Sequence, residues 1–161
     1  MRRLITLLLI TLATLSGTYK LVLAESIPIL KITIQTKQVS IKDGDIFPVT
    51  TIIQNIGKDV STLHLWICSY DEHWITDTPK VNVLEIPCDK NFIQKIKLEP
   101  GEYHKRELYL RANIVPKSPP MEMPSIRSIS FRLGFTDGRE AEHKESAKSI
   151  WSNSITLKVV K

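Results

Sequence analysis

The sequence lacks the patterns that mark the common catalytic and calcium sites. No serine is framed by glycines in a G-x-S-x-G elbow, and neither an H-E-x-x-H pair nor an EF-hand loop occurs. A Ser-His-Asp triad could be assembled only by choosing scattered residues. We therefore expect a protein that is not an enzyme and that needs no cofactor.

Long apolar runs are also missing. The apolar stretch at residues 4–15 is shorter than the ~20 residues of a membrane-spanning helix. Two arginines precede it and "LVLA", ending at Ala24, follows it, which is typical of a secretory signal peptide. We expect residues 1–24 to be removed on export to the periplasm or beyond, leaving no membrane span. An uncleaved N-terminal anchor is the alternative.

A strong basic charge disappears with this leader. The chain has 22 Lys and Arg against 17 Asp and Glu, a net charge of +5. Three of the basic residues and none of the acidic ones lie in residues 1–24, so the mature chain is near +2. Its cations are scattered, without runs or interleaved aromatic residues, so nucleic acid is not an expected partner.

Short strands account for what is present. Residues 25–161 are enough for a single domain with its own core. Apolar residues alternate or cluster between turn signals in seven segments: residues 30–34, 46–55, 62–68, 91–98, 107–114, 129–135 and 154–160. No segment gives a convincing helix, residues 139–150 are expected to form a solvated loop, and the proline-rich residues 115–125 an irregular connection. This pattern predicts an all-β, antiparallel sandwich of about seven or eight strands.

The alternation also predicts which side chains form the core. Successive side chains of a strand point to opposite faces, so one parity in each segment is buried. In residues 62–68 this parity places His64, Trp66 and Cys68 on the outer face. The expected inward set is Ile32, Ile34, Leu65, Ile67, Leu108, Leu110, Phe131, Leu133, Leu157 and Val159.

The two cysteines, Cys68 and Cys88, enclose a polar segment of the chain. An exported protein with two cysteines usually pairs them, so we expect a disulfide that fastens this segment to the edge of a sheet. A cysteine–histidine nucleophile with His64, His73 or His104 would need a free, activated thiol. Pairing of the cysteines removes that option.

Two stretches carry a family resemblance. The segment "FPVTTIIQNIGKDVSTLHLWI" resembles the second and third strands of small exported bacterial immunoglobulin-like modules, and "IWSNSITLKVV" is similar to their last strand. A looser likeness is to the BsuPI-type proteinase inhibitor sandwiches. The resemblance implies an immunoglobulin-like fold and supplies no functional residue.

The segment between the cysteines contains the candidate binding residues. Trp66 and Trp74, with His73 and Asp77, could form an aromatic surface beside a polar loop. Alternatively the rings cover a sheet edge, or Trp74 packs beneath its own loop. Asp71, Glu72, His73 and Asp77 also offer ligands for a cation, although their spacing matches no known metal motif.

A second weak candidate for a metal site lies in the proline-rich segment. Met121 and Met123 form an M-x-M pair, and thioethers suit Cu(I). Methionines of this kind more often pack onto neighbouring strands.

These observations favour an exported binding or structural module that presents a disulfide-stapled loop to a protein partner in the envelope or outside the cell. Preorganisation by the disulfide would lower the entropic penalty of binding. A proteinase inhibitor and a copper-binding protein are the alternatives.

Overall fold

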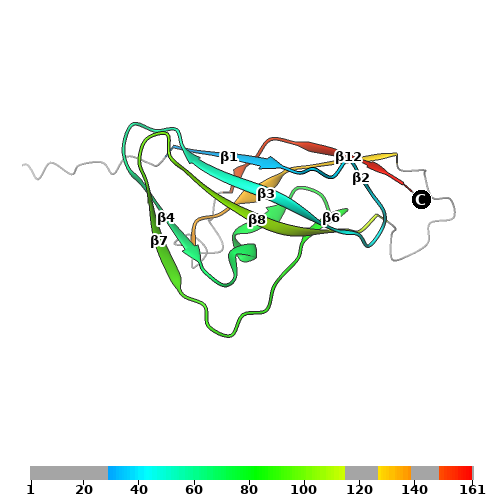
Figure 1. Ribbon diagram of the computed structural model, residues 1–161, viewed down its shortest axis with the longest axis horizontal. Coiled ribbons are helices and arrows are strands. Elements are labelled where there is room, and N and C mark those ends of the chain that lie inside the picture. The colour runs from blue at the N-terminus through cyan, green and yellow to red at the C-terminus, as the bar shows by residue number, and fades with distance from the viewer. Residues whose placement is uncertain (1–28, 115–126, 139–148, 161) are drawn as a thin grey trace, which may run out of the picture.

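The computed structural model describes residues 29–114, 127–138 and 149–160. The expected signal peptide, the pair Met121 and Met123, and most of the expected loop at 139–150 lie outside these residues. The described residues form β-sheets, antiparallel except for one parallel strand pair, and a short 3₁₀ helix, and the all-β fold is confirmed (Figure 1). The immunoglobulin-like assignment stays a prediction. The elements are β1 (Leu30–Gln35), β2 (Ser40–Ile41), β3 (Ile46–Asn55), β4 (Ser61–Trp66), η1 (Tyr70–His73), β5 (Trp74–Thr76), β6 (Val81–Val83), β7 (Ile93–Leu98), β8 (Tyr103–Ala112), β9 (Ser128–Phe131), β10 (Leu133–Phe135), β11 (Ile150–Trp151) and β12 (Ile155–Val159).

One four-stranded sheet has the order β1-β3-β8-β6, with every neighbouring pair antiparallel. Opposite it lie two short sheets, β11-β10-β5 and β2-β12-β9, in which β12 and β2 run parallel. A separate two-stranded ribbon, β4-β7, diverges from β3 and β8 at one end of the molecule (Figure 1). The segment between the cysteines begins where β4 ends.

The longest ladder, β3 with β8, follows directly from the sequence pattern. Ile46 lies opposite Arg111 at one end and Gln54 opposite Tyr103 at the other. Side chains along β3 alternate between buried and exposed, as a half-buried strand requires. The turn before β8 contains Gly101 at φ 87°, a conformation that glycine adopts without steric penalty.

Most of the predicted core residues are buried. Eight of the ten are part of one continuous apolar cluster: Ile32, Ile34, Leu65, Leu108, Leu110, Phe131, Leu133 and Leu157. Val159 is half-buried and packs against that cluster. Ile67 is half-buried and is not part of the cluster, because β4 ends at Trp66 and the alternation does not continue into the following bend.

The prediction that His64 faces outward is wrong. Leu63, His64 and Leu65 are all buried. The chain after β10 packs against this side of β4, where the Asp137 carboxylate accepts a hydrogen bond from the backbone N–H of His64 at 3.1 Å. Both faces of the ribbon are therefore covered at this point, and parity alone does not assign the outer face.

Among the described strands, β1 is at the edge of the large sheet and pairs with β3 alone. On its other side, the side-chain amide of Asn153 accepts a hydrogen bond from the N–H of Ile34 at 2.8 Å and donates one to its C=O at 3.1 Å. This amide takes the place of a neighbouring strand at one residue of the edge.

Candidate functional site

The candidate site is the segment between the two cysteines, residues 68–88, which we call the stapled segment. Cys68 and Cys88 form the expected disulfide, with a Cα–Cα distance of 5.7 Å. Neither cysteine of the chain is free, so a cysteine nucleophile is excluded. The segment has a root, residues 70–74, and a tip, residues 84–88.

His73 fixes the root to two other elements. Its imidazole is 1% exposed, its Nε2 accepts a hydrogen bond from the N–H of Trp66 at 2.7 Å, and its Nδ1–H donates to the C=O of Thr136 at 2.8 Å. This arrangement requires the neutral ring protonated on Nδ1. Burial lowers the pKa of His73, which favours the same neutral form.

The ring of Trp74 packs inside its own domain. It is 4% exposed, and its centroid lies 5.8 Å from that of Tyr70 and 5.1 Å from that of Phe135. Of the two alternatives for this ring, the structure therefore favours packing beneath its own loop. The folded molecule does not present Trp74 or His73 on its surface.

Tyr70 completes the root and links it to the large sheet. Its hydroxyl lies 3.0 Å from that of Thr51 on β3, and the guanidinium of Arg106 on β8 lies 4.6 Å from the ring centroid. Burial raises the pKa of Tyr70 to about 12, so the phenol stays protonated at neutral pH. The root is thus held by hydrogen bonds and ring contacts from β3, β4, β8 and β10.

The other predicted binding residues lie apart from the root's interior. The carboxylate of Asp77 is 2.9 Å from Nε of Arg132 and accepts the backbone N–H of the same residue at 2.8 Å. Partial burial raises the pKa of Asp77, but the hydrogen bonds from Arg132 outweigh that effect and lower it overall. Trp66, at the end of β4, is half-buried. The structure does not combine Trp66, Trp74 and Asp77 into one exposed surface.

A cavity of about 110 Å³ opens instead between the tip and β8. Asp71 lies in its wall, although only 6% of this residue is exposed, and its Oδ2 accepts a hydrogen bond from the N–H of Ile86 at 3.2 Å. Apolar side chains complete the wall together with the disulfide. They are Leu84, Ile86 and Leu108.

Four of the residues that line this cavity are exposed, and we call them the loop face: Ile86, Arg106, Glu107 and Tyr109. Ile86 is 53% exposed and Tyr109 is 42% exposed. The hydroxyl of Tyr109 donates a hydrogen bond to Oε1 of Glu107 at 2.8 Å. Sequence reasoning missed these residues; the one available signal was the outward parity of Tyr109 between Leu108 and Leu110.

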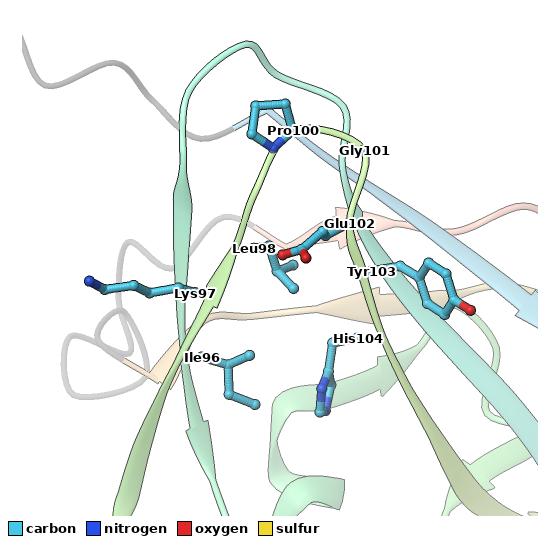
Figure 2. A pocket seen from close by; sticks show the side chains of 8 residues that line it. All are labelled: Ile96, Lys97, Leu98, Pro100, Gly101, Glu102, Tyr103 and His104. Atoms are coloured by element: carbon cyan, nitrogen blue, oxygen red, sulfur yellow. The ribbon is translucent and has the colours of Figure 1, made fainter.

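A wider groove of about 730 Å³ lies where β7 and β8 diverge. Figure 2 shows Ile96 and His104 pointing toward the space between the two strands, whereas Lys97 and Tyr103 point away from it. Burial, followed by the nearby charge of Arg106, lowers the pKa of His104. Few polar groups converge here, so this groove is chemically less specific than the loop-face cavity.

Among the described residues, no group of three or more His, Cys, Asp and Glu side chains could hold a metal ion. The acidic residues next to His73 are therefore not assembled into a cation site. Met121 and Met123 lie outside the described residues. In the described part of the chain, no helix is long and apolar enough to span a membrane.

Comparisons with known proteins give no family. No family model matches the chain, and no curated protein matches it. Among solved structures, it is similar to a β-glucosidase from Erythrobacter marinus (11% identity, TM-score 0.40) over 83% of this chain and 16% of that one. It is also similar to the sporulation control protein Spo0M from Bacillus subtilis (12% identity, TM-score 0.41) over 84% of this chain and 51% of that one. The chain thus spans a sixth to a half of these proteins, and likenesses of this strength carry no functional argument.

Proposed function

We propose that this protein is an exported, non-enzymatic binding module whose loop face contacts a protein partner. The observation that carries the proposal is the contrast within the stapled segment, where exposed residues at the tip stand on a root that is almost completely buried. Such a surface is held in place before it meets a partner.

Rigidity matters here because the loss of conformational entropy opposes binding. Each mobile side chain or loop residue that becomes ordered on association weakens the complex. The disulfide and the hydrogen bonds of His73 restrict the stapled segment in the free protein. A partner would therefore lose less binding energy to ordering than it would with an open loop.

The composition of the loop face also fits contact with another protein. Tyrosine and arginine are enriched among the residues that dominate protein interfaces, and a central apolar residue is often part of such a surface. Tyr109, Arg106 and Ile86 supply these groups around one small cavity. The area is small, so the complex would be transient unless neighbouring strands also contribute.

Export supports the same proposal. Residues 1–24 have the pattern of a signal peptide, and disulfides persist mainly in oxidising compartments. The partner would then be a protein of the envelope or the exterior.

Site-specific photo-crosslinking in the producing cell tests this function. A photoreactive phenylalanine at position 86 should give one discrete adduct with another protein. The matched control is position 103, which is 62% exposed, is the first residue of β8 and does not line the loop-face cavity. No adduct at position 86, or the same adducts at both positions, would overturn the proposal.

A further inference from the structure

Asp71 is a buried acidic group with few partners. Only 6% of the residue is exposed, and one of its carboxylate oxygens, Oδ2, accepts the N–H of Ile86. Within the described residues no other hydrogen bond and no ion pair reaches this carboxylate. A partner that covers the cavity would remove the remaining water from this carboxylate, and that is unfavourable unless the partner also brings an opposite charge.

The wall of the cavity is negative overall. Two carboxylates, Asp71 and Glu107, line it together with one guanidinium, that of Arg106. That guanidinium lies over the Tyr70 ring rather than in an ion pair with Asp71. One negative charge is therefore left over, in a site where partial exclusion of water strengthens electrostatic attraction.

The volume and the lining of the cavity limit which kind of cation it can hold. About 110 Å³ has room for roughly three or four water molecules. Leu84, Ile86 and Leu108 line it together with Asp71, and apolar residues beside an acidic group suit a chain of methylene groups that ends in a positive charge. Lysine has this form, whereas the flat guanidinium of arginine prefers two acceptors side by side.

We propose that the loop-face cavity receives a lysine side chain of the partner, with its ammonium group against the carboxylate of Asp71. The inference rests on the proposed function and adds to it the chemistry that the partner must present. Contact with Asp71 supplies specificity, because a partner without the cation leaves that carboxylate buried and unpaired.

The test uses two small probes with the purified protein. N-acetyl-lysine methylamide carries the cation, and N-acetyl-norleucine methylamide has the same apolar chain without it. In an NMR titration we expect saturable amide shifts near Asp71, Ile86 and Tyr109 with the lysine probe only. Equal shifts with both probes, or none with the lysine probe, would overturn the proposal.

Matched variants separate charge from packing. Asp71→Asn keeps the size of the side chain and an oxygen for the N–H of Ile86, and it should weaken binding of the lysine probe tenfold or more. Asp77→Asn removes an exposed carboxylate elsewhere on the stapled segment and should leave that affinity unchanged. Unchanged affinity in Asp71→Asn, with native near-UV circular dichroism, would show that the lysine probe does not bind through Asp71 and would overturn the proposal.

Crosslinking at position 86 distinguishes failure of this inference from failure of the proposed function. If the adduct forms equally well in Asp71→Asn, the loop face binds a partner but the lysine contact is wrong. If the lysine probe binds through Asp71 but the protein with the photoreactive residue at position 86 and an unchanged Asp71 gives no adduct, the proposed function is wrong. The cavity is then a cation site of another kind.

Discussion

The root and the tip of the stapled segment lie within twenty residues of each other, but they differ in how far their side chains are buried. At the root, Tyr70, His73 and Trp74 are all at most 5% exposed and contact strands from both layers. At the tip, Ile86 is more than half exposed, and its backbone N–H bonds the root residue Asp71. The comparison shows that a cluster of aromatic and polar residues in the sequence can be buried in the core. A single apolar residue, Ile86, faces the solvent instead.

Removing a ring from the root should have the largest effect. Trp74→Ala leaves a cavity beside Tyr70 and Phe135, and we expect the free energy of unfolding to fall by about 3–5 kcal/mol. The matched control is Trp151→Ala, whose ring is 39% exposed, with an expected loss below about 1 kcal/mol. Urea unfolding measures both, and equal losses would contradict the assignment of Trp74 to the core.

Opening the disulfide affects both ends of the segment. Replacing Cys68 and Cys88 by serine should lower the free energy of unfolding by up to about 3 kcal/mol, because the unfolded chain gains freedom. The β3–β8 ladder lies outside the stapled segment and should remain folded. Hydrogen exchange would show this as faster exchange at the tip with protection retained in β3. Loss of protection throughout β3 would contradict it.

Acid should act on the root through His73. Its pKa in the folded protein is below the ordinary value of 6.5, so the unfolded chain takes up a proton first as the pH falls. Above pH 6.5 the folded protein has the full stability that His73 contributes. As the pH falls from 6.5 to the pKa of His73 in the folded protein, this contribution is lost, at no more than about 1.4 kcal/mol per pH unit.

The variant His73→Gln tests this contribution. It should be less stable at neutral pH and should show a flatter decline between pH 6.5 and 5 than the wild-type protein. His104→Gln is the comparison, because the pKa of His104 is lowered as well. An unaltered slope in His73→Gln would mean that other groups cause the acid sensitivity.

Changes at the tip should have the smallest effect on stability. Ile86→Asp and Tyr109→Ala alter exposed side chains, and each should change the free energy of unfolding by less than about 0.5 kcal/mol. Both should nevertheless reduce crosslinking from a second position in the loop face, residue 107. If either substitution lowers the free energy of unfolding by more than this, the tip is a structural extension of the root.

The sequence predicts the long strands well because their alternation continues over enough residues to be recognised. β3 and β8 each cover ten residues, and the buried parity of Leu108 and Leu110 agrees with the prediction. β5 and β6, within the stapled segment, cover three residues each. A period of two cannot be established over so short a stretch, and these strands form because β10 and β8 offer them backbone partners.

The candidate site was predictable in its outline but not in its parts. The disulfide follows from the number of cysteines and the expected export. Whether His73 is buried depends on Thr136, which is 63 residues away in the sequence. Likewise, the loop-face cavity exists because the tip meets Arg106 and Tyr109 of β8, and no local pattern contains that contact.

The amide of Asn153 has a consequence for the protein at high concentration. An edge strand with free N–H and C=O groups is a template onto which the strands of other molecules can assemble, and this is how ordered aggregates begin. Asn153 occupies both groups of Ile34 near the end of β1. A strand from another copy would have to displace this amide before it could pair with β1 along its full length, so one side chain helps to keep neighbouring copies apart.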